Sequence, residues 1–192
     1  MTAPLLIGLI GNAGADKDTV AAYLEHEHAF ETLGFADPIL DMACALFHSV
    51  DVDTAYAIER HLKERPVDVL NLSYRQIAQS LGTGWGRELV APDLWIRIAD
   101  HTLKQRRLHG DDVAISDVRF KNEAEWIRHS GGVLVRVHRS GLQPVASHVS
   151  ETELAGIQAD HELLNDGSLS TLFDQVDRLL DTLRPSGAPS HL

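Results

Sequence analysis

The chain has 192 residues, of which 44% are hydrophobic, and this size suits one domain with a sizeable core. Its formal net charge of -11 makes it a poor candidate for a general duplex-DNA binder, because contacts to the phosphate backbone need clustered Lys and Arg. The single cysteine, Cys44, excludes a disulfide within the chain and fits a reducing cytoplasm, and no apolar stretch approaches the roughly 20 residues of a membrane span.

The first part of the chain alternates strand and helix patterns. The apolar run 5–10 predicts a buried parallel strand, and a glycine-rich turn then leads into a helix over 18–28. A second strand is expected over 32–35. The segment 53–65 is expected to be helical or mobile. The remaining helices are expected at 39–47, at 74–81 and from 94 to about 107. Their start signals are Asp37-Pro38, a cap at Ser73 and a cap at Asp93, respectively.

The second part of the chain continues this alternation. Strands are predicted at 112–116, which ends at Asp117, and at 133–137 and 163–164, with a helix over 122–130. The final helix, 169–183, is amphipathic, and 185–192 is expected to be a disordered tail. These patterns predict a layered α/β fold with a parallel sheet, in one domain over 1–184. Ligands of such folds bind at the carboxyl ends of the strands.

The strongest motif follows the first strand and is close to a Walker A loop, G-x-x-x-x-G-K-[ST]. Backbone N–H groups there can surround phosphate oxygens, and Lys17 supplies a charge for the outer phosphates. Two residues depart from the pattern. Asp16 replaces the second glycine, and Asp18 stands where a hydroxyl is usual, with Thr19 one residue later. Asp18 and Thr19 are the expected Mg²⁺ contacts. The residues expected to bind ATP are Gly11, Asn12, Ala13, Gly14, Ala15, Asp16, Lys17, Asp18 and Thr19. The alternative is a glycine-rich turn that binds no ligand.

Several segments, in their shared order, resemble the bacteriophage deoxynucleoside monophosphate kinases. They are K-D-T-V-A (17–21), G-F-A-D-P-I-L (34–40), L-G-T-G-W-G-R-E (81–88), P-D-L-W (92–95), D-V-R-F-K-N-E (117–123), H-V-S-E (148–151) and N-D-G-S-L (165–169). The resemblance implies a P-loop kinase with a three-layer α/β/α fold. Such a kinase transfers the γ-phosphate of ATP to a deoxynucleoside monophosphate, with Mg²⁺, in the bacterial cytoplasm. The resemblance is also compatible with a homodimer.

Phosphoryl transfer needs positioned positive charge, so arginines on loops at strand ends are candidates. Arg119 is expected to hold the acceptor phosphate; the alternative is a surface ion pair with Glu123 or Glu125. Asp117 either orients Mg²⁺ or accepts a proton, or else it caps the next helix. Arg139 is expected to reach the transferring phosphoryl group.

Arg136 could also reach that group, but both Arg136 and Arg139 could instead be charges that protect an edge strand. His148, Ser150 and Glu151 have the composition of a hydrolase site, and a helix cap at Ser150 is the alternative.

On the acceptor side the candidates are Asp37, Trp85 and Arg87, with the alternative that Asp37 only begins a helix. Arg87 is expected in a glycine-rich turn that could bring its guanidinium close to a ligand. Trp95 and Trp126 could also stack on a base, although Trp126 fits a core position better. The resemblance implies a turn that contacts adenine at Asn165, Asp166 and Gly167; a plain turn is the alternative.

Two other functions fit parts of the pattern. A dephospho-coenzyme A kinase shares the opening I-G-L-x-G, and a degenerate nucleotide-binding module without activity would explain Asp16. Because a carboxylate near the phosphates repels them unless it pairs with a cation, we expect a P-loop of normal shape with weakened ATP affinity. Asp16→Gly is then expected to tighten ATP binding.

Overall fold

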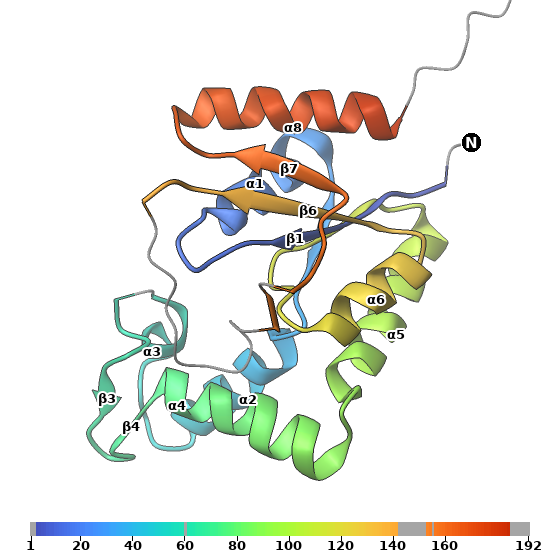
Figure 1. Cartoon of the computed structure of the whole chain (residues 1–192). Helices are drawn as coiled ribbons and strands as arrows, with labels where there is room; N and C mark the ends of the chain where they lie inside the picture. The colour runs from blue at the N-terminus through green and yellow to red at the C-terminus, as the bar shows by residue number, and fades with distance from the viewer. Residues whose placement is uncertain (1–2, 60, 142–152, 155, 185–192) are drawn as a thin grey trace, which may run out of the picture. The chain divides into compact units, whose positions relative to one another are not determined.

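The computed structural model describes residues 3–59, 61–141, 153–154 and 156–184 (Figure 1). The chain forms two compact units, which are described separately. Unit 1 comprises Met1–Leu33 and Thr102–Leu192, and unit 2 is Gly34–His101. The tail expected at 185–192 lies outside the described residues, and the single domain over 1–184 stays a prediction.

Unit 1 is built on a parallel sheet. Its strands are β1 (Leu6–Ile10), β2 (Glu31–Leu33), β5 (Val113–Ile115), β6 (Val133–His138) and β7 (His161–Leu164). They lie in the order β2-β5-β1-β6-β7, and each pair of neighbours is parallel. The predicted parallel sheet is therefore confirmed, with strand ends shifted by up to two residues. All five residues of β1 are buried, because this strand is at the centre of the sheet.

Helices cover both faces of this sheet. On one face, α1 (Lys17–His28) and α8 (Leu169–Leu183) enclose a core with Ile7 and Leu9 of β1. On the other face, α6 (Lys121–His129) packs closely, since a Cβ added to Gly8 would lie 2.5 Å from Cδ1 of Ile127. Alternate residues of β1 thus face opposite layers. Figure 1 shows the resulting order of helix, sheet and helix, which confirms the three-layer α/β/α fold.

Unit 2 is mainly helical. Its elements are α2 (Asp37–His48), α3 (Ala55–Ile58), the antiparallel strands β3 (Pro66–Val67) and β4 (Leu72–Ser73), α4 (Tyr74–Gln79), the π-helix η1 (Ser80–Val90) and the first part of α5 (Leu94–His109). Its core is formed by Ala43, Phe47, Ala57, Val67 and Ile77. The predicted cap at Ser73 is confirmed, because its hydroxyl accepts the Gln76 N–H and the Gln76 side chain accepts the Ser73 N–H.

One local prediction in unit 2 is confirmed only in part, and another is wrong. Only Ala55–Ile58 is helical within the described part of 53–65, and turns follow it. The glycine-rich stretch around Arg87 is not a turn but part of η1. Gly86 allows the Trp95 ring to lie against the helix, because a Cβ at this position would lie 2.3 Å from the ring. The indole N–H donates to the Gly82 carbonyl at 2.8 Å.

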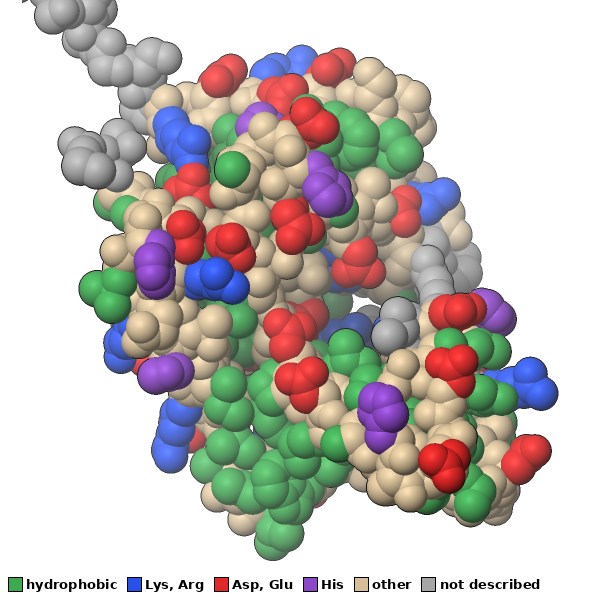
Figure 2. Space-filling model, turned by 180° about the vertical axis from the view of Figure 1, so that it is seen from behind, with side chains coloured by type: hydrophobic (Ala, Val, Ile, Leu, Met, Phe, Trp, Pro, Cys, Tyr) green, Lys and Arg blue, Asp and Glu red, His purple; other side chains and the backbone are tan. Residues whose placement is uncertain are grey.

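The surface matches the composition. Asp and Glu side chains are spread over the face seen in Figure 2, as the net charge of -11 requires. Apolar side chains also gather on part of that face. In the described ranges, no helix combines the length and the apolar character that crossing a bilayer would require.

Candidate nucleotide site

The carboxyl ends of four neighbouring strands bring most of the predicted site residues to one edge of the unit 1 sheet. The P-loop follows β1, Asp117 and Arg119 follow β5, Arg139 follows β6, and Asn165 follows β7. The connection from β1 leads toward β2, whereas the one from β5 leads to β6 on the other side of β1. Ligands of open parallel sheets bind where the connections diverge in this way.

The P-loop has the backbone of a phosphate cradle. Gly11 has φ 152° and Gly14 has φ 82°, in the region that side chains disfavour. A Cβ at Gly11 would lie 2.5 Å from the Val137 carbonyl oxygen, so only glycine fits there. The Ala15 N–H donates to the Asn12 carbonyl at 3.1 Å, which closes the turn before α1 begins at Lys17. The helix N-terminus adds its positive dipole end to this concave loop.

Lys17 folds back over the loop. Its Nζ donates to the Gly11 carbonyl at 2.9 Å and to the Asn12 carbonyl at 3.2 Å. The ammonium group therefore lies at the loop, where the motif predicts it. Asp18 is exposed and Thr19 is half-buried in the first turn of α1. The described residues contain no group of three or more His, Cys, Asp or Glu that could hold a metal.

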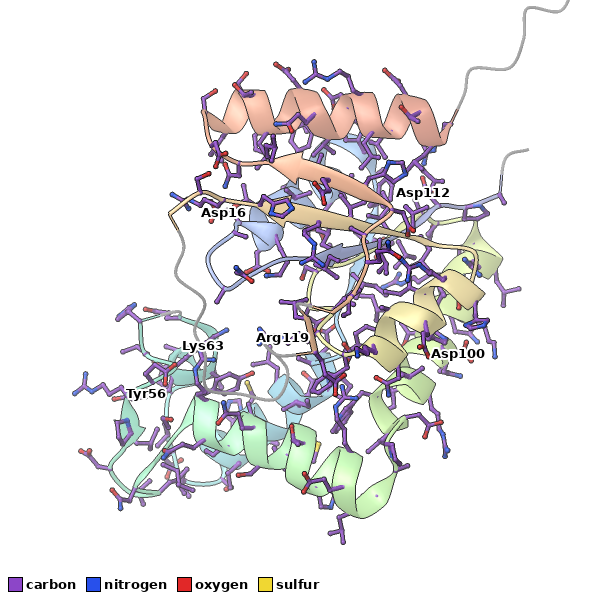
Figure 3. All side chains as sticks on the ribbon, viewed as in Figure 1. Asp16, Tyr56, Lys63, Asp100, Asp112 and Arg119 are labelled. Carbon is purple, nitrogen blue, oxygen red and sulfur yellow. The ribbon has the colours of Figure 1, made fainter. Side chains whose placement is uncertain are left out.

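Asp16 is held by two other segments of unit 1. It takes the left-handed conformation, φ 68° and ψ 35°, at the N-cap of α1. Its Oδ2 forms an ion pair with Nη1 of Arg139 at 2.7 Å and accepts the side-chain amide of Asn165 at 2.8 Å. The carboxylate is therefore paired with a cation, which is the condition under which its repulsion of phosphate is offset. Figure 3 shows Asp16 at the start of α1.

The segments after β6 and β7 are also joined to each other. Oδ1 of Asp166 accepts the Ser140 N–H at 2.7 Å, and the Asn165 N–H donates to the His138 carbonyl at 2.7 Å. Donation from the Ser140 N–H and hydroxyl holds the pKa of Asp166 below its usual value. A Cβ at Gly167 would make only ordinary contacts with Thr171. The loop at 165–167 is thus fixed next to the P-loop.

The segment after β5 is organised by Glu123, which the sequence suggested only as a surface ion-pair partner of Arg119. Glu123 is 1% exposed, and its Oε2 accepts the N–H groups of Arg119 and Phe120. Phe120, and not Asp117, is the N-cap residue of α6, so the expectation that Asp117 could cap this helix is wrong. The Arg119 residue is exposed (Figure 3). The feature of the sequence that could have indicated this capping role is an acidic residue at the third position of the helix.

The positions of two arginines and two tryptophans in the fold decide between the roles expected for them. Strand β6 lies between β1 and β7, so the edge-strand explanation for Arg136 and Arg139 is wrong. Arg136 donates through Nη2 to the Ile157 carbonyl. Trp95 is 2% exposed and belongs to the core of unit 2, which corrects its expected role in base stacking. Trp126 is half-buried. His148, Ser150 and Glu151 lie outside the described residues.

Of the acceptor-side candidates, Asp37, Trp85 and Arg87 lie in unit 2, and Arg119 lies in unit 1. Asp37 is the first residue of α2, and its Oδ2 accepts the Gly34 N–H at 2.7 Å, as the helix-start alternative expects. Desolvation of the Asp37 carboxyl raises its pKa, although the residue as a whole is exposed. The hydrogen bond from the Gly34 N–H lowers this pKa, and the negative charge of Asp41 raises it further. Trp85 is 41% exposed, and Nη1 of Arg87 donates weakly to the Pro92 carbonyl at 3.4 Å.

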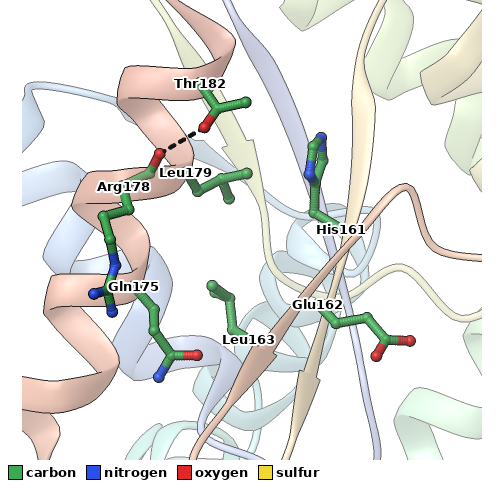
Figure 4. Close-up of a pocket in the computed structure, with 7 residues that line it drawn as sticks. All are labelled: His161, Glu162, Leu163, Gln175, Arg178, Leu179 and Thr182. Carbon is green, nitrogen blue, oxygen red and sulfur yellow. Dashed lines mark hydrogen bonds between the residues drawn. The ribbon is translucent and has the colours of Figure 1, made fainter.

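Another hollow of unit 1, of about 250 Å³, lies along β7 and α8 (Figure 4). It is lined by His161, Glu162, Leu163, Gln175, Arg178, Leu179 and Thr182. The Thr182 hydroxyl donates to the carbonyl of Arg178. None of these residues belongs to the P-loop, and none is among the residues that contact Asp16, which are Arg139 and Asn165.

Comparison with known proteins identifies the family. The model of the deoxynucleotide monophosphate kinase family matches residues 50–176. A protein of Acanthamoeba polyphaga mimivirus, whose name assigns it to these kinases, is 33% identical over 92% of this chain and 96% of its own length. The chain belongs to the deoxynucleotide monophosphate kinase family.

Other relatives agree with this assignment. The deoxynucleoside-5′-monophosphate kinase of Escherichia phage T5 is 24% identical over 91% of this chain and 92% of its own. Among solved structures, shikimate kinase from Aquifex aeolicus has a TM-score of 0.53 at 13% identity, over 95% of this chain and 100% of that one. This last likeness concerns the fold alone, and it matches the P-loop kinase architecture of unit 1.

Proposed function

We propose that this chain transfers the γ-phosphoryl group of ATP to a deoxynucleoside 5′-monophosphate, giving ADP and the deoxynucleoside diphosphate. An oxygen of the acceptor phosphate forms a bond to Pγ, and the bond from Pγ to the β-phosphate oxygen breaks. The observation that carries the proposal is the match to the deoxynucleotide monophosphate kinase family, including a relative aligned over 92% of the chain.

The P-loop supplies the donor side of this reaction. Its glycines, the helix N-terminus and Lys17 suit the β- and γ-phosphates of ATP. Asn165, Asp166 and Gly167 are the proposed adenine contacts, since they are held close to the P-loop through Asp16. A bound Mg²⁺ would neutralise negative charge on the phosphates during transfer. Asp18 and Thr19 fit such an ion, because Mg²⁺ takes few protein ligands when phosphates supply others.

The remaining residues are proposed for the acceptor and for the transferred group. Arg119 offers a guanidinium fork for the acceptor phosphate, and Arg139 is the cation beside the P-loop. Asp117 is proposed to orient water on the metal or to accept a proton. Asp37, Trp85 and Arg87 of unit 2 are proposed to bind the nucleoside.

A homodimer and a location in the host cytoplasm are also proposed. Light scattering after size-exclusion chromatography tests the homodimer.

The test is a panel of acceptors. The purified chain is incubated with ATP, Mg²⁺ and each of the four deoxynucleoside monophosphates, with the ribonucleotides and dephospho-coenzyme A in parallel. Chromatography of the nucleotides measures product and ADP together. We expect ADP and a deoxynucleoside diphosphate in equal amounts from at least one deoxynucleotide. Turnover of dephospho-coenzyme A alone would contradict the proposal and support the other kinase, and ATP binding without transfer to any acceptor would support a degenerate module.

A further inference from the structure

We propose that Asp16 is a positioning residue, whose carboxylate holds the Arg139 guanidinium and the Asn165 amide at the P-loop. The proposal rests on the proposed kinase function and concerns its nucleotide site. The Walker A pattern has glycine at this position, so a side chain here adds a function that the loop itself does not need. Asp16 is then an active part of the site and not merely a tolerated substitution.

The contacts show what the carboxylate joins. Arg139 is 123 residues from Asp16 in sequence and Asn165 is 149 residues away, yet both donate to the same Oδ2, at 2.7 and 2.8 Å. The Arg139 Nη1 also lies 3.4 Å from the Gly14 carbonyl oxygen. A second carboxylate, Asp166, accepts the N–H of Ser140. Two acids therefore join the P-loop, the segment after β6 and the segment after β7.

Burial makes this arrangement more specific than a surface ion pair. The side chain of Asp16 is 25% exposed and that of Arg139 is 48% exposed, and an isolated pair at such exposure contributes little. Asn165, however, is only 7% exposed, so its amide is fixed and presents its donor to Asp16. The Asn165 amide thereby helps to orient the carboxylate that pairs with Arg139.

Backbone geometry explains why an aspartate can stand here. The residue has φ 68°, and Asp is one of the few side chains that enter the left-handed region at low cost. The loop can therefore keep its shape while gaining a short acceptor that reaches both donors. The negative charge is compensated by Arg139, and the pair brings a guanidinium to the rim of the phosphate cradle before nucleotide arrives.

This account changes the expected effect of removing the carboxylate. If Asp16 were only tolerated, Asp16→Gly would remove a negative charge and tighten ATP binding whether or not Arg139 is present. If Asp16 positions Arg139, glycine removes a repulsion but also releases the guanidinium, so the two effects oppose each other. When Arg139 is absent, only the repulsion remains, and glycine should then tighten binding clearly.

The test is a double-mutant cycle with Asp16→Gly, Arg139→Ala and the double variant. Calorimetry with a nonhydrolysable ATP analogue and Mg²⁺ gives the dissociation constants, and steady-state kinetics gives kcat and KM. In the Arg139→Ala background, we expect Asp16→Gly to tighten the analogue by about tenfold, within the range of coupling between contacting residues. In the background with Arg139, we expect no tightening and a kcat reduced by about tenfold.

Two further variants separate charge from shape. Asp16→Asn keeps the size and an acceptor for Asn165 but loses the ion pair, and we expect it to lower kcat as glycine does. Asp181→Asn, an exposed position on α8, changes the net charge equally and should leave all constants unchanged. Equal tightening by Asp16→Gly in both backgrounds, or a kcat within twofold of the parent for Asp16→Gly or Asp16→Asn, would overturn the proposal. Failure of the parent chain to bind the analogue would instead refute the proposed function.

Discussion

The Oε2 atom of Glu123 lies 2.7 Å from the main-chain nitrogen of Arg119 and accepts its N–H. The same oxygen accepts the N–H of Phe120 at 3.0 Å, and the Glu123 side chain is buried. An acid inside the fold thus fixes the backbone of the segment that carries the proposed phosphate-binding arginine. Two hydrogen bonds to one buried side chain therefore define the backbone conformation at Arg119 and Phe120.

Glu123→Ala is expected to lower the free energy of unfolding by roughly 2–3 kcal/mol, because it leaves main-chain donors without their acceptor. Loosening of the segment should also raise KM for the monophosphate. Urea unfolding and steady-state kinetics measure the two effects. Glu125→Ala is the matched control: this glutamate is exposed on the same helix, and its loss should change stability by no more than about 0.5 kcal/mol. Equal losses for both variants would contradict the structural role of Glu123.

Arg119→Ala is expected to act mainly on acceptor binding. Losing a charge-assisted contact to the acceptor phosphate should cost roughly 2–5 kcal/mol, which is about 30-fold or more in KM for the monophosphate. KM for ATP should change little. Varying one substrate at saturating levels of the other separates the two constants. The control is Arg178→Ala, an exposed arginine on α8. Unchanged kinetics for Arg119→Ala would leave Arg119 as a surface residue.

Lys17→Ala is expected to abolish phosphoryl transfer and to leave the fold intact. The Lys17 ammonium donates to the carbonyl groups of Gly11 and Asn12. An alanine at this position supplies no positive charge for the outer phosphates. Product formation measures the first effect, and circular dichroism with thermal unfolding measures the second. Lys104→Ala, on the exposed side of α5, should keep full activity. Near-full turnover by Lys17→Ala would remove this lysine from the mechanism.

The sequence predicted the parts of this molecule that local patterns determine. Apolar runs gave the strands, and the order of glycines, lysine and helix gave the P-loop. The partners of Asp16 could not be predicted, because Arg139 and Asn165 approach it only through the order of β1, β6 and β7 in the sheet. Strand order also decides that β6 is internal, which periodicity within one segment cannot show.

The error around Arg87 has a different physical origin. Three glycines within five residues favour a turn on propensity alone, and glycine weakens a helix. Here the glycines belong to η1, and the Trp95 ring lies in the space that one of them, Gly86, leaves. Packing of a large aromatic side chain outweighs the local cost of glycine, and this tertiary effect is absent from any short window of sequence.

That packing gives the last prediction, which compares two glycines of η1. A Cβ at Gly86 would lie 2.3, 2.6 and 2.8 Å from three atoms of the Trp95 indole, whereas a Cβ at Gly84 meets nothing within 4 Å. The indole cannot move away cheaply, because its N–H is bonded to the Gly82 carbonyl and the ring is buried. Gly86→Ala should therefore destabilise the chain by about 1–3 kcal/mol through overpacking.

Gly84→Ala should instead be neutral or stabilise by up to about 1 kcal/mol, since alanine favours a helix over glycine. Urea unfolding followed by tryptophan fluorescence measures both variants, and Gly86→Ala should also shift the emission because the Trp95 environment changes. Both substitutions add one methyl group to the same helix, so their difference isolates the contact with Trp95. Equal stability changes would mean that the ring does not occupy this position in solution, and that Gly86 has no packing role.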